Sequence, residues 1–376
     1  MTTIKENKSK SIGVISLPMG PANIRPFHNF VNIMAKITND LRVVATYQDG
    51  LDVGPFCSPK SYEIRFSLKH NVLERIFIFV AIQIRMCWNI LNNFQDVEIC
   101  FMYLGDFLIL PLIMARIMNM KTVLIMGGNM NNEFDFNKNP ILYVIKLFRF
   151  IDLHLFNKIL LYSPHLVEEW GLEKYRNKII INREHFVDVD EFKVDISFCK
   201  RKNIVGFIGR FSEEKGISNF VHAIDKIDSE KDIGFLIGGD GYLKRNILDS
   251  LSANSKKNVE YVGWIPHNML PLYLNKLKLL VLPSYSEGLP NIMLESMSCG
   301  TPVLVTSVGA IPDIIINNEN GFILKNNLPE NIAKNIINIL RNSDLELISK
   351  RSRISIEKDF ILIAVVEKWK TTLNII

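Results

Sequence analysis

Several features that would point to common kinds of site or protein are missing from this sequence. It has five cysteines in 376 residues, none in a C-x-x-C pair, which argues against a disulfide framework or a zinc site and favours a reducing cytosol. It has no low-complexity tract, and with 48% hydrophobic and 22% charged residues it is neither disordered nor collagen-like. It also lacks a G-x-x-x-x-G-K-[ST] loop, so we exclude a nucleotide site of the Walker type.

Long apolar segments are scarce as well. No run reaches the roughly 18–20 apolar residues that span a bilayer. The longest candidates are Ile76–Ile84, which Arg85 ends, and Phe107–Met118, which contains Pro111 and Arg116. Both are typical of buried helices, and the alternative is a helix that lies on a membrane with basic residues at its rim. The amino-terminal apolar run has about seven residues and leads into a turn, unlike a signal peptide.

The net charge of +5 is distributed unevenly. Residues 1–185 contain 21 basic and 16 acidic side chains, whereas the remainder contains 23 of each. The whole surplus lies in the first half, which favours an anionic partner there, such as a phosphorylated molecule or a lipid surface. We do not expect nucleic acid as a partner, because no basic patch interleaved with aromatic residues occurs.

Short apolar runs alternate with helical patterns along the whole chain. Ile217–Ile227 is typical of a helix, with apolar residues at i, i+3, i+4 and i+7. The runs that we predict as strands are Ile12–Leu17, Val43–Tyr47, Val97–Tyr103, Thr122–Met126 and Lys158–Tyr162 in a first series, and Ile204–Ile208, Gly234–Ile237, Val259–Gly263, Leu279–Pro283 and Val303–Thr306 in a second. Continuous apolar strands that alternate with helices predict parallel sheets covered on both faces. We therefore predict two doubly wound α/β domains, residues 1–188 and 189–359.

One turn combines glycines with two cations. The residues after the strand Ile204–Ile208 read G-R-F-S-E-E-K-G from Gly209 to Gly216. Glycine lets a ligand approach the backbone, and the N–H groups at a helix start bind anions. Arg210 can bind phosphate oxygens in a bidentate manner, and Lys215 adds a point charge. The pattern predicts a diphosphate clamp; a surface loop with two solvated cations is the alternative.

A second turn carries two carboxylates. After the strand Leu279–Pro283, Glu287 lies in the turn, Pro290 suits the first turn of a helix, and Glu295 follows about one turn later. Carboxylates accept strong hydrogen bonds from sugar hydroxyls, and the helix start between them can hold phosphate. This arrangement indicates a polyhydroxylated, phosphorylated ligand, and the alternative for each acid is a solvated surface charge.

Two weaker glycine turns support this interpretation, G-G-D-G at Gly238–Gly241 and G-W-I-P at Gly263–Pro266. Glycine-rich turns are common, so each alone says little. For Trp264 we expect a buried packing role, and stacking on a nucleobase is the alternative.

Together these turns resemble the glycosyltransferases of GT-B fold, in particular the retaining family 4 type (glycosyl transferases group 1). The most specific stretch is P-S-x-x-E-G-L-P-x-x-x-L-E-x-M-x-x-G-x-P-V from Pro283 to Val303, which contains the E-x7-E pair of that family as Glu287 and Glu295. The resemblance implies two Rossmann-like domains that face each other across a cleft. It also implies that the last helix, Phe360–Asn374, returns to the first domain, so that residues 360–376 belong there.

The resemblance further implies a nucleotide diphosphate sugar, a UDP-sugar or GDP-sugar, as donor, and no metal or other cofactor. In that family, residues at the positions of Arg210 and Lys215 bind the diphosphate. Glu287 would contact the hydroxyls of the donor sugar, and Glu295 those of the ribose. The catalytic residues would be Glu287, Arg210 and Lys215. The backbone that lies against sugar and phosphate would come from Gly209, Gly288, Leu289 and Pro290.

The first domain fits the family less closely. Its loop after the first strand, Pro18–Pro21, matches a glycine-rich loop only loosely, with Gly20 as the best candidate. Where many members have a histidine after a middle strand, this chain has Gly127-Gly128-Asn129, and Asn129 or a backbone amide would replace it. Nearby Glu133 and Asp135 are expected to be solvated. Structural or surface positions are expected for His28, His154, His165, His185 and His267.

We therefore expect a retaining hexosyltransferase of cell-surface polysaccharide or glycoconjugate synthesis, with a glycan or polyprenyl-linked acceptor. We expect it in the cytoplasm, peripheral on the inner face of the cell membrane, with an anionic membrane surface as a candidate partner. The alternatives are a sugar-nucleotide epimerase of the same fold and a sugar-nucleotide-binding protein without catalysis, which the missing histidine favours. An altered free sugar nucleotide formed without acceptor would indicate the epimerase.

Overall fold

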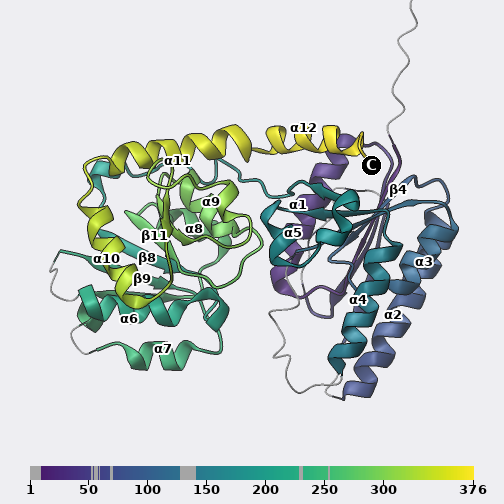
Figure 1. The fold of residues 1–376 in the computed structure, drawn as a ribbon, viewed down its shortest axis with the longest axis horizontal. Coiled ribbons are helices and arrows are strands. Elements are labelled where there is room, and N and C mark those ends of the chain that lie inside the picture. Colours follow the sequence, from purple (N-terminus) through teal and green to yellow (C-terminus); the bar gives the residue numbers. More distant parts are fainter. Residues whose placement is uncertain are drawn as a thin grey trace, which may run out of the picture. The chain divides into compact units, whose positions relative to one another are not determined.

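A computed structural model of the chain describes residues 10–51, 54, 58, 60–67, 71–127, 141–227, 232–252 and 255–376. The chain divides into two compact units (Figure 1). Unit 1 comprises Met1–His185 and Val365–Ile376, and unit 2 comprises Phe186–Ala364. The sequence analysis predicts the boundaries between the two domains after residue 188 and after residue 359.

Unit 1 contains a parallel sheet with the strand order β3-β2-β1-β4-β5-β6-β7. Because β1 lies between β2 and β4 and pairs with both, the chain changes direction across the sheet at the β1–β4 pair. In a doubly wound sheet this switch point is where ligands bind, beyond the carboxyl ends of the strands. In chain order the strands are β1 (Ile12–Ser16), β2 (Leu41–Gln48), β3 (Lys60–Phe66), β4 (Ile99–Tyr103), β5 (Lys121–Ile125), β6 (Lys158–Leu161) and β7 (Ile179–Ile181).

The helices of unit 1 cover both faces of this sheet, with α2, α3 and α4 side by side (Figure 1). α1 begins directly after Gly20 with Pro21, a residue whose fixed φ suits the first helical position. Asn71 caps α2, because its side chain accepts a hydrogen bond from the backbone N–H of Leu73 at 3.0 Å. These helices are α1 (Pro21–Ile37), α2 (Val72–Asn93), α3 (Ile109–Ile117), α4 (Ile141–Leu155) and α5 (His165–Glu169).

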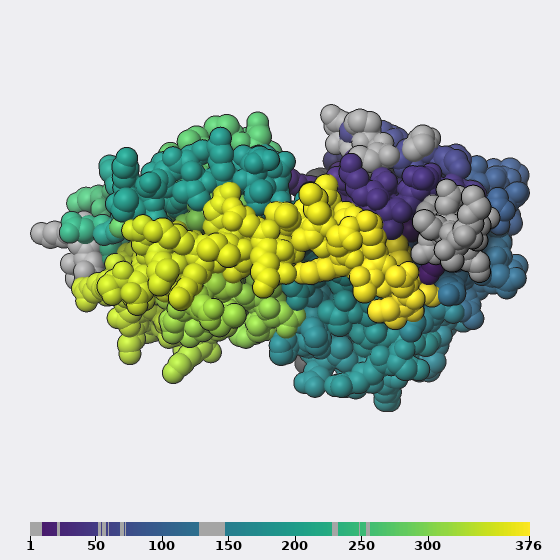
Figure 2. Space-filling view, turned by 90° about the horizontal axis from the view of Figure 1, so that it is seen from above, coloured from purple at the N-terminus to yellow at the C-terminus, as the bar shows by residue number. Residues whose placement is uncertain are grey.

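The C-terminal segment completes the core of unit 1. Trp369 of α12 (Leu362–Leu373) is fully buried, and its ring packs edge-on against Phe30 and Phe101 at centroid distances of 5.3 and 5.8 Å. The Trp369 indole N–H also donates to the carbonyl of Arg183 at 2.8 Å. Figure 2 shows this yellow segment lying against the purple and teal parts of unit 1. Burial of one such aromatic side chain is worth roughly 1.5–3 kcal/mol, so the segment is an integral part of the unit.

Unit 2 contains a second parallel sheet, with the order β10-β9-β8-β11-β12-β13. α6, α7 and α10 cover one face, and α8, α9 and α11 cover the other (Figure 1). The strands are β8 (Ile204–Ile208), β9 (Gly234–Gly238), β10 (Val259–Gly263), β11 (Leu279–Leu282), β12 (Val303–Thr306) and β13 (Phe322–Leu324). The helices are α6 (Ile217–Ile227), α7 (Lys244–Ser250), α8 (Leu270–Leu274), α9 (Asn291–Ser298), α10 (Pro329–Leu340) and α11 (Leu345–Asp359).

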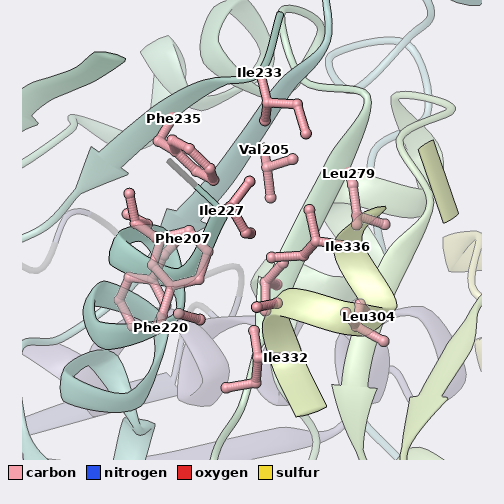
Figure 3. Close-up of a cluster of buried hydrophobic side chains, with 14 of the residues drawn as sticks. Val205, Phe207, Phe220, Ile227, Ile233, Phe235, Leu279, Leu304, Ile332 and Ile336 are labelled. Carbon is pink, nitrogen blue, oxygen red and sulfur yellow. The ribbon is translucent and has the colours of Figure 1, made fainter. Parts of the chain in front are cut away.

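The core of unit 2 lies between its sheet and the helices α6 and α10 (Figure 3). Phe220 of α6 and Ile336 of α10 are fully buried against strand residues such as Val205. Because both strands of the switch point, β8 and β11, take part in this core, the loops that follow them start from fixed positions.

The predicted fold class is confirmed: both units are doubly wound α/β structures with parallel sheets. The prediction omitted three strands, β3, β7 and β13. β3 reads K-S-Y-E-I-R-F and has only Ile64 buried, because it is an edge strand that faces solvent. β7 and β13 have three residues each, too few for a periodic signal.

One expectation about the apolar segments is wrong. Arg85 ends the apolar run but not the helix, because α2 continues to Asn93 and Arg85 is an exposed residue within it. Residues Leu73–Asn93 form the one helix among the described residues that is long and apolar enough to cross a membrane, by length and composition only. Only 22% of its apolar 18-residue stretch is buried, so the expectation that Ile76–Ile84 belongs to a buried helix is wrong.

Candidate functional site

The candidate site lies at the switch point of the sheet in unit 2. β8 pairs with β9 on one side and with β11 on the other, so the loops after β8 and β11 are neighbours. These loops are the two that the sequence singles out, residues 209–216 and 284–290. A backbone hydrogen bond of 2.8 Å from the Tyr285 N–H to the Glu214 carbonyl joins them directly.

Lys215 and Glu287 form an ion pair across these two loops. The Lys215 Nζ donates to Glu287 Oε2 at 2.8 Å, while the Ser284 hydroxyl donates to Glu287 Oε1 at 2.8 Å. The Glu287 side chain is 7% exposed and that of Lys215 is 26% exposed, so the pair is partly withdrawn from water. Both carboxylate oxygens therefore have a donor, which fixes the orientation of the carboxylate.

Two glycines allow the loops to approach this closely. Gly216 has φ of 66°, and a Cβ there would lie 2.1 Å from the Pro283 carbonyl oxygen. Gly309, in the loop after β12, has φ of 59°, and a Cβ would lie 2.1 Å from the Glu287 carbonyl oxygen. Residues with a side chain rarely adopt this left-handed backbone conformation, so both positions require glycine. The Ala310 N–H also donates to the Gly288 carbonyl at 2.8 Å, and the loop after β12 thereby supports the segment that carries Glu287.

Arg210 lies on the same loop as Lys215 but takes no part in the Lys215–Glu287 pair. Its Nη1 is 3.4 Å from Glu214 Oε1, and its side chain is 57% exposed. The neighbouring Gly209 donates its N–H to the Gly238 carbonyl at 3.0 Å. Arg210 is therefore a solvent-exposed cation attached to a fixed segment of backbone, and a phosphate group can reach it.

The amino end of α9 lies between the two glutamates in the chain. Leu289 and Pro290 are buried there, Gly288 is half-buried, and no side chain caps the helix. The first N–H groups of an α-helix carry partial positive charge and have no partner within the helix. This end can therefore accept an anion next to Lys215 and Glu287.

Glu295 is engaged by a histidine that the sequence interpretation leaves aside. His267, just before α8, donates from Nε2 to Glu295 Oε1 at 2.8 Å, and its Nδ1 is 3.6 Å from Glu191 Oε1. Glu295 is 7% exposed, so the contact orients a buried carboxylate. His267 directly follows the G-W-I-P turn, and this position after a glycine turn is the only sequence signal that could have indicated it.

Two further sequence features bear on the predicted site. Trp264 is 71% exposed, so the predicted buried packing role is wrong. A D-x-D tripeptide occurs at Asp188–Asp190, but Asp188 Oδ1 accepts the backbone N–H groups of Asp190 and Glu191 at 3.0 and 3.2 Å. It therefore stabilises a local turn. No group of three or more potential metal ligands gathers within the described part of the chain.

In unit 1, Gly20 follows β1 at the switch point of the sheet. It precedes α1 with extended backbone, and a Cβ at this position would meet no atom within 4 Å. Gly20 is therefore not packed against a neighbouring residue on the side where a Cβ would lie. Asn129, Glu133 and Asp135 lie outside the described residues.

The loop after β4, which the sequence interpretation missed, also lies at this switch point. Leu104 and Phe107 have φ of 51° and 71°, a strained conformation for residues with side chains. The Phe107 N–H donates to Asp152 Oδ2 of α4 at 2.7 Å. Burial raises the pKa of Asp152 to about 7 and also raises that of Asp106. Among the described residues, one buried oxygen of each carboxyl has no hydrogen-bond partner, which is uncommon for buried polar atoms.

Comparison with protein families finds a match in the second unit. Residues 188–357 match the model of the family "Glycosyl transferases group 1". The match covers less than half of the chain, and we call the matched residues the group 1 domain after the family they resemble. The domain contains every predicted site residue of unit 2, from Gly209 to Glu295.

Several relatives of this chain are glycosyltransferases by name. An uncharacterized glycosyltransferase of Methanocaldococcus jannaschii is 31% identical over 139 residues, which is 37% of this chain and 38% of that protein. A Campylobacter jejuni relative is 30% identical over 199 residues, which is 52% of this chain and 53% of that protein. It is named as an α-1,4-N-acetyl-D-galactosaminyltransferase that acts on an undecaprenol-diphosphate-linked GalNAc glycan. The chain spans about half the length or less of the curated relatives it matches.

Solved structures extend the comparison from the group 1 domain to the whole fold. Sucrose-phosphate synthase of Thermosynechococcus elongatus has a TM-score of 0.78 at 16% identity and covers 97% of this chain and 98% of its own. HepE of Anabaena, solved with UDP, has a TM-score of 0.75 at 13% identity and covers 97% of this chain and 100% of its own. At this identity the likeness establishes the fold alone, which is the GT-B fold of two parallel-sheet α/β domains.

Proposed function

We propose that this protein is a retaining glycosyltransferase that moves a sugar from a nucleotide diphosphate sugar to a glycan or lipid-linked acceptor. The acceptor would belong to cell-surface polysaccharide or glycoconjugate synthesis. The observation that carries the proposal is the Lys215–Glu287 pair at the switch point of the group 1 domain, with a contact of 2.8 Å. The loops after β8 and β11 thereby hold Lys215, a cation that can bind phosphate, beside Glu287, a carboxylate that can bind hydroxyl groups.

Each group in the site has a role that suits one part of such a donor. Arg210 and Lys215 would bind the diphosphate, together with the amino end of α9. Lys215 has three N–H donors, so it can keep its bond to Glu287 while the others bind phosphate oxygens. Glu287 would accept from the hydroxyls of the transferred sugar, and Glu295, held by His267, from those of the ribose. The backbone of Gly209 and Gly288–Pro290 would line the space between them.

The chemistry demands a site that stabilises separated charge. As the bond from the anomeric carbon to the phosphate oxygen breaks, its electron pair stays on the diphosphate while the sugar becomes cationic. The cations Arg210 and Lys215, with the helix amino end, stabilise the departing diphosphate, and Glu287 stabilises the sugar. The acceptor hydroxyl attacks on the face that the diphosphate leaves, and its proton passes to a phosphate oxygen. The product keeps its anomeric configuration, and neither a metal ion nor a separate base is required.

The comparisons favour a uridine nucleotide and a lipid-linked acceptor as the first compounds to test. Structures of HepE, a neighbour in fold, contain UDP and UDP-glucose, and the Campylobacter relative is named for an undecaprenol-linked acceptor. In our proposal Gly20 and Asn129 of unit 1 would contact the acceptor. The surplus of basic over acidic residues in the first half of the chain also favours an acceptor that carries phosphate.

A thermal-shift screen across UDP-sugars and GDP-sugars tests the proposal, because a ligand that binds only the folded state raises the melting temperature. The stabilising donor is then incubated with polyprenyl-diphosphate-linked sugars in the presence of EDTA, and the product is examined by NMR. A product with inverted configuration would refute retention, and loss of turnover in EDTA would refute metal independence. Conversion of the free donor into its epimer without acceptor would show an epimerase instead.

A further inference from the structure

Seven large apolar side chains of α2 are exposed along one side of the helix. Their exposed fractions range from 42% for Val80 to 75% for Phe77. They recur at steps of three or four residues, with one adjacent pair, which keeps them on one helical face. Over 18 residues at about 1.5 Å each, this stripe is roughly 27 Å long. We call it the α2 stripe; it consists of Leu73, Ile76, Phe77, Val80, Ile84, Trp88 and Leu91.

The other side of α2 is bound to unit 1. Ile82, Met86 and Ile90 are buried. The buried Gln83 accepts the backbone N–H of Leu110 through its Oε1 at 3.1 Å. A helix that crossed a bilayer would have to leave these contacts and carry Gln83, Arg75 and Arg85 into hydrocarbon. α2 therefore presents one apolar face while it stays attached by the other.

The neighbouring helix α3 widens the stripe. Leu110, Ile113 and Ile117 of α3 are 41%, 41% and 70% exposed and recur at i, i+3 and i+7. α2 and α3 pack against each other along unit 1 (Figure 1). The combined α2–α3 face consists of the α2 stripe and these three residues. An exposed apolar face of this kind is unusual in a monomeric protein and indicates an interaction site.

The charges on α2 and α3 favour a negative partner. The two helices carry three arginines, Arg75, Arg85 and Arg116, and one acidic residue, Glu74. All four are exposed. A two-fold contact with a second copy would bring the same arginines of both copies near one another, whereas an anionic lipid surface would attract them.

We propose that the α2–α3 face docks unit 1 onto an anionic lipid bilayer, with α2 lying parallel to the surface. The apolar side chains would enter the boundary between headgroups and acyl chains, and the arginines would contact lipid phosphates. Trp88, with its amphipathic indole, suits that boundary. The proposal rests on unit 1 alone and does not depend on the donor site in unit 2.

The main test is co-sedimentation of the full-length protein with phosphatidylglycerol–phosphatidylcholine vesicles at about 0.1 M salt or below. The test variant combines Phe77→Gln, Ile84→Gln and Trp88→Gln. The control combines Leu347→Gln, Ile354→Gln and Ile363→Gln, which remove side chains that are 47%, 58% and 73% exposed elsewhere. We expect the test variant to lose at least tenfold in vesicle affinity and the control less than twofold.

Three further measurements distinguish docking on the bilayer surface from misfolding and from insertion across the bilayer. Both variants should keep the melting temperature and the far-ultraviolet circular dichroism spectrum of the natural protein, which shows that they remain folded. In a Trp264→Phe background, which removes the other exposed tryptophan, Trp88 emission should shift to the blue when vesicles are added. Alkaline carbonate should release the bound protein, as expected for a helix on the surface.

Four results would overturn the proposal. The first is that the natural protein does not bind anionic vesicles at low salt, and the second is that the test variant binds them as well as the natural protein does. The third is that the protein stays in the membranes after a carbonate wash, which would indicate a spanning helix. The fourth is a dimer in sedimentation equilibrium that the test variant abolishes while vesicle binding is absent, because the face would then serve a second copy of the chain.

Discussion

Lys215 donates to Glu287 over 2.8 Å and so ties the loop after β8 to the loop after β11 at the switch point of unit 2. The pair has a structural consequence, since Glu287 is 7% exposed and would be a buried, uncompensated charge without Lys215. It also has a functional one, because a donor diphosphate that reaches Lys215 is placed next to the carboxylate that would bind the sugar. Under the proposed function, stability and catalysis therefore depend on the same contact.

Lys215→Ala should lower kcat/KM by about 100- to 1000-fold, the usual effect of removing one preorganised donor that stabilises developing negative charge. It should also lower the melting temperature, because Glu287 loses its cation. In the double variant Lys215→Ala, Glu287→Gln part of that stability should return, since no charge is then left unpaired. Steady-state kinetics and thermal melting measure both effects. The assignment of the site is wrong if Glu287→Ala leaves kcat/KM within twofold.

Arg210→Ala should weaken donor binding without a loss of stability. Arg210 is 57% exposed and pairs with the exposed Glu214 at 3.4 Å, and such surface pairs contribute about 0–1 kcal/mol. We expect the KM for the donor to rise about tenfold with an unchanged melting temperature. Arg245→Ala is the matched control, because Arg245 is 94% exposed and faces Asp249 at 3.8 Å on α7. If Arg245→Ala raises the KM for the donor as much as Arg210→Ala does, the rise comes from the lost positive charge in general and not from a lost phosphate contact.

The sequence was sufficient to predict the two sheets and the loops that carry the site. β8 and β11 are continuous apolar runs, and parallel strands place the ends that follow them at one edge. It could not predict that Lys215 contacts Glu287, 72 residues later, because that contact depends on the register of β8 and β11 and on glycine at 216 and 309. β3 was missed because an edge strand with polar side chains has no strong apolar pattern.

The helix α2 shows a second limit of sequence interpretation. Its apolar residues lie on more than one face, and the pattern alone does not say which face other elements cover. The structure buries Ile82, Met86 and Ile90 and leaves the α2 stripe exposed. His267 was missed for a related reason: a single histidine after a glycine turn gives no indication that Glu295, 28 residues later, lies 2.8 Å away.

His267→Ala should act mainly on donor binding. The imidazole holds Glu295 through a 2.8 Å contact, and Glu295 is the proposed ligand of the ribose. Without that contact the carboxylate is free to rotate, so we expect the KM for the donor to rise about tenfold and kcat to change by less than threefold. His267→Gln should restore part of the affinity, because its side-chain amide can donate to Glu295.

The control for this experiment is His154→Ala in unit 1, which removes an exposed histidine that contacts Tyr175. It should leave both kinetic constants unchanged. Equal losses in kcat and in kcat/KM for His267→Ala would contradict a positioning role, since they would place the histidine at the transition state.

Asp152→Asn should stabilise the protein at high pH. Burial raises the pKa of Asp152 to about 7; the nearby Asp106 carboxyl adds to this shift, and the Phe107 N–H opposes it. Burial also raises the pKa of Asp106, although Arg149 opposes that shift. The folded chain therefore keeps a proton between about pH 4 and pH 7 that the unfolded chain has lost, so the free energy of unfolding falls as pH rises through this range. The cost, fully present above pH 7, is on the order of a few kcal/mol.

An asparagine at position 152 can still accept the Phe107 N–H and carries no charge, so the variant should escape this cost. Thermal melting should show the variant several degrees above the natural protein at pH 8 and close to it near pH 4, as expected from linkage between proton binding and folding. Asp96→Asn is the control, because the side chain of Asp96 is 87% exposed and its nearest cation, Arg42, is 3.9 Å away. If the melting temperature of Asp152→Asn differs from that of the natural protein by the same amount at every pH, the pKa of Asp152 is not raised in the folded state and the prediction is wrong.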